Sequence, residues 1–214
     1  MKFSDRIDAG RRLAGAAQHL RDRDVVVCGL PRGGVPVAYE VALSLGAPLD
    51  VIVVRKLGFP GQPELAMGAV GEAGARVVND GLVARAGLTA DELAEIEEKA
   101  SAQVRRAAQT FRNGLAPVSR AGRTVVIVDD GIATGSTATA ACQVARAEGA
   151  ARVVLAVPVA PAGWTLTMGG AADEYISVET PRSMMAVGYW YRDFSPTTDS
   201  EVVNCLAGSL QWRE

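Results

Sequence analysis

One segment, residues 125–137, constrains the fold more than any other part of this chain. It opens with four apolar residues, Val125–Val128, continues with Asp129 and Asp130, and ends in a short loop of small and polar residues. A continuous apolar run of this length predicts a strand that is covered on both faces. The residues that follow, Ser136–Glu148, predict a helix that Gly149 ends. The segment therefore predicts a strand–loop–helix unit.

The same alternation of apolar runs and helices extends along most of the chain. Further buried strands are predicted at Val25–Leu30, Asp50–Val54, Arg152–Val159 and Tyr175–Val178. Helices are predicted at residues 4–20, at about 36–45, from a capping box at Thr89 to about Arg112, and after a second capping box at Thr198. Between the second strand and the long helix, residues 55–63 are expected to be irregular and residues 66–78 to form a hairpin. This order predicts an α/β fold with a mostly parallel, twisted sheet flanked by helices.

Composition narrows the class of protein. Apolar residues make up 49% of the 214 residues, which predicts a globular protein, and the formal charge of −2 argues against a surface for nucleic acid. Three widely spaced cysteines show no metal-binding pattern. Because the first residues lack the apolar core of a signal peptide, we expect a cytoplasmic protein with no membrane association. We expect a single domain over residues 1–214 with its core at about 20–160.

The loop after Asp130 has the composition of a phosphate-binding loop. Small residues let the backbone approach an anion closely, and the N-terminus of the following helix favours negative charge. Two carboxylates beside a phosphate site require a ligand that also brings hydroxyl groups or a divalent cation. A phosphorylated sugar with magnesium meets both requirements.

Residues 125–137 resemble the ribose-5-phosphate signature of the type I phosphoribosyltransferases at every position. The resemblance implies that Asp129 and Asp130 hold the ribose hydroxyls of phosphoribosyl pyrophosphate (PRPP) and bind Mg²⁺, partly through water. It also implies that the loop residues Ala133, Thr134, Gly135, Ser136 and Thr137 bind the 5′-phosphate. The alternative, which involves no ligand, is a strand that ends in a polar turn, with Asp130 capping the helix.

Two further segments match the family's pyrophosphate-binding positions. Arg32, Gly33 and Gly34 follow the first predicted strand, where the family binds pyrophosphate through a basic residue and glycine. Arg55 and Lys56 follow the second predicted strand, where the family has a mobile loop that closes over the sugar. The resemblance makes Arg32 catalytic together with the acid pair. A solvated, glycine-rich turn is the alternative for each of these cations.

Residues 163–195 resemble the C-terminal hood of the purine-type family members, and Tyr175, Met185, Val187 and Asp193 are the candidate acceptor-binding residues. The departures from the family pattern are informative. Met185 stands in place of the stacking aromatic residue, Pro158 in place of a base-reading lysine, and Ala133 in place of the general-base aspartate. The usual determinants for hypoxanthine or guanine are therefore missing, and Asp193 and Glu174 are weak candidates for a base. Packing of these aromatic residues into the core is the competing interpretation.

The resemblance implies a phosphoribosyltransferase of nucleotide metabolism that uses Mg²⁺ and PRPP to transfer ribose 5-phosphate to a nitrogenous acceptor, such as a nucleobase. One alternative is a non-catalytic regulatory protein that binds PRPP or a nucleotide. Another is a phosphorolytic or hydrolytic enzyme that acts on an existing nucleotide at the same site. The acceptor stays unassigned, and a homodimer is expected only by analogy with the family.

Overall fold

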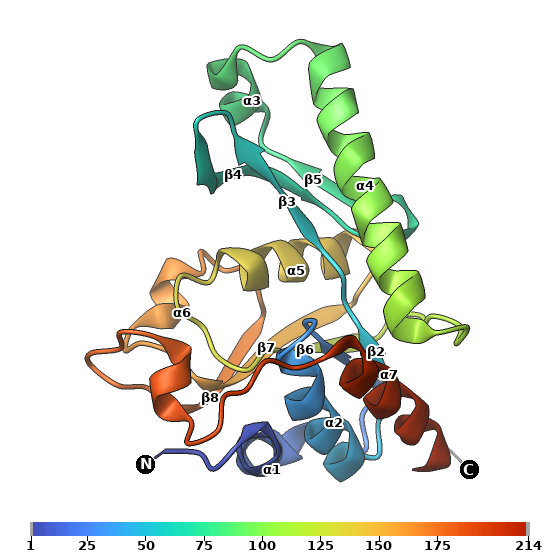
Figure 1. The fold of residues 1–214 in the computed structure, drawn as a ribbon, viewed down its shortest axis with the longest axis vertical. Helices are drawn as coiled ribbons and strands as arrows, with labels where there is room; N and C mark the ends of the chain where they lie inside the picture. Colours follow the sequence, from blue (N-terminus) through green and yellow to red (C-terminus); the bar gives the residue numbers. More distant parts are fainter. Residues whose placement is uncertain (1, 213–214) are drawn as a thin grey trace.

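A five-stranded sheet forms the centre of the computed structural model, which describes residues 2–212 (Figure 1). The strand order is β2–β1–β6–β7–β8, and every neighbouring pair is parallel. The strands are β1 (Val25–Gly29), β2 (Leu49–Val51), β6 (Thr124–Val128), β7 (Arg152–Val159) and β8 (Glu174–Glu179). The predicted α/β fold with a parallel sheet is thus confirmed.

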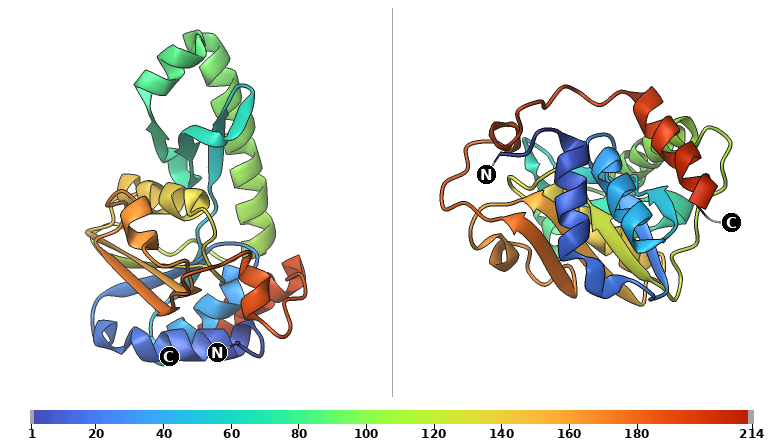
Figure 2. Two further views of the ribbon diagram at one scale, coloured as in Figure 1. Left: turned by 90° about the vertical axis from the view of Figure 1, so that its left-hand side faces the viewer. Right: turned by 90° about the horizontal axis from the view of Figure 1, so that it is seen from below.

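Helices cover both faces of this sheet (Figure 2). One face carries α1 (Arg6–Ala16), α2 (Gly34–Leu45) and α7 (Asp199–Gly208), and the other carries α5 (Ser136–Ala147) and α6 (Trp164–Thr167). Along β1, Val25 and Val27 join the first core, whereas Val26 and Cys28 join the second. Burial on both faces explains the unbroken apolar runs of the sequence. Within the described part of the chain, no helix is both long and apolar enough to span a membrane.

A separate lobe, residues 55–112, projects from the side of the sheet that α5 covers (Figure 1). It contains a three-stranded antiparallel sheet and two helices. These elements are β3 (Arg55–Phe59), β4 (Gln62–Val70), a 3-10 turn (Glu72–Gly74), β5 (Arg76–Val78), α3 (Asp80–Ala86) and α4 (Ala90–Arg112). The predicted hairpin of residues 66–78 is found as β4 and β5.

Three predicted elements need correction, and one helix was missed. Residues 55–63 are not irregular, because β3 and β4 pair across a tight turn in which Gly61 has a φ of 75°. The strand predicted at Asp50–Val54 ends at Val51, where its ladder with β1 stops and the chain leaves for the lobe. The helix predicted at 4–20 divides into α1 and a 3-10 turn, Gln18–Leu20. Helix α3 was not predicted, although Asn79 caps its start.

The chain closes with a segment that crosses the carboxyl edge of the sheet. After a 3-10 turn at Val187–Trp190, residues 191–198 run in an extended path to α7, which is followed by a further 3-10 turn at Ser209–Trp212 (Figure 2). We call residues 191–198 the strap. Backbone hydrogen bonds join the strap to the N-terminus, from Arg192 N to Phe3 O at 2.8 Å and from Asp193 N to Ser4 O at 2.9 Å.

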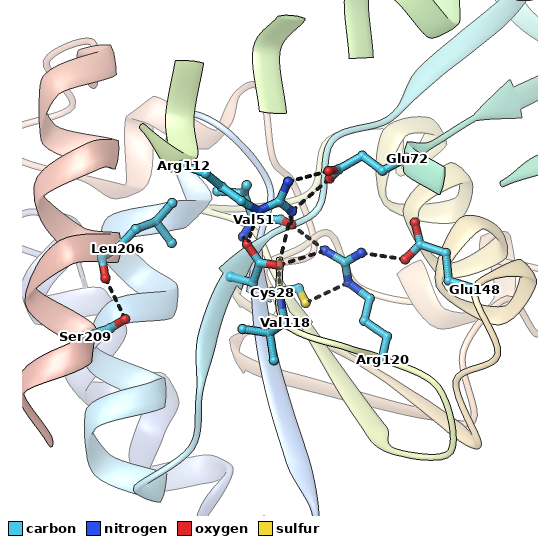
Figure 3. A network of polar contacts seen from close by, with 10 residues as sticks. Cys28, Val51, Glu72, Arg112, Val118, Arg120, Glu148, Leu206 and Ser209 are labelled. Carbon is cyan, nitrogen blue, oxygen red and sulfur yellow. Dashed lines mark hydrogen bonds and ion pairs between the residues drawn. The ribbon is translucent and has the colours of Figure 1, made fainter. Parts of the chain in front are cut away.

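A buried network of charged side chains joins the lobe to the sheet (Figure 3). At the end of α4, Arg112 donates from Nε to Asp50 Oδ1 at 2.8 Å and from Nη2 to Asp50 Oδ2 at 3.1 Å. The same guanidinium bonds to Glu72, on the turn between β4 and β5. Although burial acts to lower the pKa of Arg112, the two carboxylates raise it above its ordinary value. One cation thus ties the lobe helix, the lobe hairpin and β2 together.

A second arginine extends the network to α5. Arg120 donates from Nη1 to Glu148 Oε2 at 2.6 Å, from Nη2 to Val51 O at 2.6 Å and from Nε to Cys28 Sγ at 3.3 Å. Its side chain is only 6% exposed. Because both arginines reach the end of β2, this network fixes the base of the lobe where the chain leaves the sheet and returns to it.

Candidate functional site

The acid pair lies at the carboxyl edge of the parallel sheet, directly after β6. Asp129 Oδ1 accepts the backbone N–H of Asp130 at 2.9 Å. The loop after β1 starts beside it, because Leu30 N donates to Val128 O at 2.8 Å. Two segments about a hundred residues apart in the sequence therefore begin at the same point of the sheet edge, as expected for neighbouring parallel strands.

Two glycines of that loop lie against the acid pair. A Cβ atom on Gly33 would be 2.0 Å from Asp130 Oδ2. A Cβ atom on Gly34 would be 2.5 Å from Val128 O and 2.8 Å from Asp129 Cα. Neither position has room for any larger residue. The predicted pyrophosphate loop and the predicted sugar-binding carboxylates are thus in direct contact.

Two side chains that the sequence analysis missed hold Asp130. Arg6, the first residue of α1, places Nε and Nη2 each 2.9 Å from Asp130 Oδ2. Tyr191, in the strap, donates its hydroxyl to the backbone oxygen of Asp130 at 2.5 Å. These residues come from opposite ends of the chain, and no local pattern in the sequence connects them with residues 125–137.

Burial and mutual repulsion shape the electrostatics of the pair. Burial, followed by the negative charge of Asp130, raises the pKa of Asp129 from 3.8 to about 7. Burial also raises the pKa of Asp130, although Arg6 acts in the opposite direction. The pair is therefore short of positive charge in the protein alone. A cation bound there would favour the ionised form of both carboxyls.

The predicted phosphate loop connects Asp130 to α5. Gly135 precedes the helix in the left-handed conformation, with a φ of 78°, and a Cβ there would be 2.6 Å from Met168 Sδ. Thr134 Oγ1 and Ser136 Oγ lie 3.4 Å apart. Lys56 of the lobe donates to Ser136 Oγ at 3.0 Å. A helix start, paired hydroxyls and an ammonium group thus meet where an anion is expected.

The remaining predicted cations border a hollow of about 440 Å³ beside this loop. Its lining includes Arg32, Arg55 and, from the phosphate loop, Thr137, together with Leu30, Pro31, Ile52, Val53, Val54 and Phe111. The peptide bond between Pro31 and Arg32 is cis. Arg32 forms an ion pair with Asp199 at 3.3 Å, and about half of each side chain is exposed. Because exposed ion pairs are weak, this contact leaves Arg32 able to turn toward a more strongly charged ligand.

The predicted acceptor residues are placed differently from one another. Val187 lies against the loop, since a Cβ on Gly131 would be 2.6 Å from Val187 Cγ1, and Met185 is 85% exposed. Tyr175 instead packs edge-on against Trp164 with ring centroids 5.3 Å apart, as the core-packing alternative expects. Asp193 Oδ1 accepts both the N–H and the hydroxyl of Ser195.

The second carboxylate considered as a base, Glu174, is also engaged. Its Oε1 lies 2.6 Å from His19 Nε2, and its Oε2 accepts a hydrogen bond from Arg152 at 2.5 Å. The sequence offered no way to see these pairings, because His19 and Glu174 lie in distant parts of the chain.

Comparison with known proteins agrees with this geometry. A family model described as the phosphoribosyl transferase domain matches residues 5–166, which include the acid pair, the phosphate loop and Gly33–Gly34. The chain belongs to the phosphoribosyltransferase family. Enzymes of this family are pentosyltransferases, and the chain contains the family's domain over residues 5–166.

Named relatives of this phosphoribosyltransferase chain come from two strains of Mycobacterium tuberculosis, CDC 1551/Oshkosh and H37Rv. Both are provisionally named as phosphoribosyl transferases and are 56% identical to this chain over 204 residues. The match covers 95% of this chain and 46% of each relative, so the chain spans about half of their length. The chain is also similar to TT1426 from Thermus thermophilus, whose crystal structure is known. The two sequences are 42% identical, the match covers all of both chains, and the TM-score is 0.89.

The donor set of this candidate site fits magnesium. Mg²⁺ takes oxygen ligands and is commonly held by one or two carboxylates together with water and substrate phosphates. Asp129 and Asp130 provide such carboxylates beside a predicted phosphate loop. In the part of the chain that the structure describes, no cluster of three or more His, Cys, Asp or Glu side chains could hold a metal ion by itself.

Proposed function

We propose that this chain transfers ribose 5-phosphate from PRPP, bound with Mg²⁺, to a nitrogenous acceptor such as a nucleobase. The observation that carries the proposal is the meeting of Asp129, Asp130 and Gly33 at one edge of the sheet, next to the loop before α5. A phosphosugar with a charged leaving group needs these three kinds of group close together.

Each end of PRPP has a complementary partner in this arrangement. The backbone N–H groups at the start of α5 and the hydroxyls of Thr134, Ser136 and Thr137 bind the 5′-phosphate. Asp129 and Asp130 accept hydrogen bonds from the ribose hydroxyls. Because the remote phosphate is anchored, its binding energy fixes the position of the reacting carbon, C1.

The reaction breaks the C1–O bond to pyrophosphate, which leaves with the electron pair, and forms a C1–N bond to the acceptor. Positive charge develops on the sugar, next to the two carboxylates. Arg32 and Arg55, which border the same hollow, and Lys56 would neutralise the leaving pyrophosphate, and Gly33 and Gly34 would let it approach the backbone. Bound Mg²⁺ supplies further charge neutralisation of the pyrophosphate.

The acceptor is best placed on the side of Val187 and Met185, next to the loop. This side offers an apolar contact and an exposed, flexible methionine, which suits a planar or variable acceptor. Tyr175 and Asp193 remain predictions for this role. With Ala133 in the loop, an acceptor that loses its proton readily is favoured.

Release of pyrophosphate tests the proposal. The protein is incubated with Mg²⁺ and PRPP against a panel of purines, pyrimidines and small amines, and pyrophosphate is measured. Release that depends on one acceptor supports the transferase and names its substrate. The double variant D129N/D130N, with its fold checked by circular dichroism, is expected to release none.

Two other outcomes contradict the transferase. Tight, Mg²⁺-dependent binding of PRPP without release for any acceptor indicates a regulatory protein that senses PRPP. Absence of both binding and release indicates that the loop before α5 holds a different phosphate compound.

A further inference from the structure

Arg6 is enclosed by two parts of the chain at the edge of the site, the loop after β6 and the strap. Besides its two contacts with Asp130 Oδ2, it donates from Nη1 to the backbone oxygen of Ser195 in the strap at 2.7 Å. Its guanidinium carbon lies 4.1 Å from the centroid of the Phe194 ring. Only 12% of the side chain is exposed. The guanidinium is thus held by a carboxylate, a carbonyl and an aromatic face.

These contacts make the two acids of the pair inequivalent. Both contacts from Arg6 fall on Asp130 Oδ2, the same atom that occupies the space beside Gly33. The other oxygen of Asp130, Oδ1, has no part in this ion pair. No ion pair involving Asp129 is found among the described residues. Asp130 is therefore oriented by a direct ion pair, whereas Asp129 accepts the backbone N–H of Asp130 and has no direct ion pair.

The fold does not need Arg6 to hold the chain ends together. The N-terminus and the strap are already joined by two backbone hydrogen bonds, and the rings of Phe3 and Tyr191 pack 5.4 Å apart between centroids. A hydroxyl bond from Tyr191 also ties the strap to the acid pair after β6. Desolvating a guanidinium is costly, so its placement at this carboxylate calls for a further reason.

We propose that Arg6 is a positioning residue of the phosphoribosyl site, which holds the Asp130 carboxylate against Gly33 so that Oδ1 is directed to the ribose hydroxyls. The assignment rests on the proposed function. Without Arg6, Asp130 faces the charge of Asp129 with no compensation and leaves this orientation. The site then has to be ordered by the ligand, and PRPP binds more weakly.

A double-mutant cycle in PRPP binding tests this role. The dissociation constant of PRPP is measured by calorimetry with saturating Mg²⁺ for wild type, R6Q, D130N and R6Q/D130N, and melting temperatures confirm folding. The matched control is R12Q, because Arg12 also lies on α1, pairs with a carboxylate (Asp8) and stacks over an aromatic ring (Phe3) without touching Asp130.

We expect R6Q to weaken PRPP binding about tenfold or more, which corresponds to about 1.4 kcal/mol, and R12Q to leave it unchanged. The double variant should bind as D130N does, because Arg6 acts through Asp130. R6K should restore only part of the affinity, since an ammonium group keeps the charge but not the planar fork. If R6Q does not fold, R6K, which retains the charge, gives the same comparison with wild type.

Three results overturn the role of Arg6. The first is a folded R6Q variant that binds PRPP as tightly as wild type does. The second is a double variant whose fold-loss of PRPP affinity equals the product of the fold-losses of R6Q and D130N. Failure of the wild-type protein to bind PRPP overturns the proposed function, and with it this role. The first two results leave the proposed function standing, so the two failures are distinguishable.

Discussion

At the scale of single residues, the site depends on two glycines, which have no side chain, as much as on its charged residues. Gly33 and Gly34 adopt ordinary negative-φ backbone, so conformational freedom does not explain them. Space does, because a Cβ atom at either position would overlap the acid pair or the backbone that carries it. The glycines let the loop after β1 contact the carboxylates after β6.

The change Gly33→Ala tests this close approach. A methyl group 2.0 Å from Asp130 Oδ2 and 3.2 Å from Arg6 Nε must displace the carboxylate, so we expect PRPP affinity to fall about tenfold or more. Gly15→Ala is the control, since no neighbouring atom lies within 4 Å of its added Cβ. Calorimetry with PRPP and Mg²⁺ measures the effect, and G33A binding as tightly as G15A would contradict the prediction.

Asp129 gives the unliganded protein a specific pH dependence. Its carboxyl titrates near 3.8 in the unfolded chain and near 7 in the fold, so the fold binds the proton more tightly. Ionisation therefore costs stability as the pH rises from about 4 to about 7, and the full cost remains at higher pH. We expect the melting temperature of D129N to exceed that of wild type by a margin that grows across this range.

The control for this experiment is D173N. The hydrogen bond from Arg146 and the one from the backbone of Val153 lower the pKa of Asp173, so its ionised form stabilises the fold above about pH 4. D173N should therefore melt below wild type at neutral pH. A margin between D129N and wild type that stays constant with pH would contradict the assignment for Asp129.

The sequence revealed the parts of the site that lie close together along the chain, and not those that contact one another from distant positions. Asp129, Asp130 and the loop after them form one local segment, and their residue types alone indicated a phosphosugar site. Arg6 and Tyr191 lie 124 and 61 residues from Asp130 and depend on how both chain ends pack across the sheet edge. No local periodicity encodes such contacts, and the first helix contains several arginines, any of which could have contacted the site.

At the scale of elements, the strongest local signals were also the most reliable. Both capping boxes, at Thr89 and Thr198, are present and start α4 and α7. The weakest predictions fell on residues 55–63, where glycine and proline favoured an irregular segment. Antiparallel pairing with β4 outweighs that tendency, with irregular register around Gly58.

Helix α4 is anchored by the charge at its C-terminal end. Arg112→Gln leaves the Asp50 side chain, which is 3% exposed, without its main cation, so we expect the free energy of unfolding to fall by about 3–5 kcal/mol. Arg105→Gln removes a half-exposed partner of Glu98 on the same helix and should cost about 0–1 kcal/mol. Urea denaturation measures both, and equal losses would show that the buried network does not anchor the lobe.

At the scale of the whole molecule, the lobe stands over the phosphate loop and is joined to the sheet through two crossings of the chain. The chain enters it through residues 52–54 and leaves it after Arg112, where the charged network holds both crossings (Figure 3). A groove of about 590 Å³ is lined by residues of β4, β5 and α5, and Thr134 and Ser136 form part of its wall. The groove therefore lies between the lobe and the phosphate loop, where a bound ligand would contact both.

We expect the lobe to close over the phosphate loop when PRPP binds. Lys56 Nζ already lies 3.0 Å from Ser136 Oγ, so a phosphate bound to the loop attracts this ammonium group and draws β3 toward the core. We expect PRPP with Mg²⁺ to slow amide hydrogen exchange in β3 and β4, and Lys56→Ala to abolish most of that slowing. Lys99→Ala, an exposed change on α4, should leave the slowing intact. Exchange in the lobe that is unaffected by a ligand shown to bind would mean that the lobe stays open and that Lys56 acts without closure.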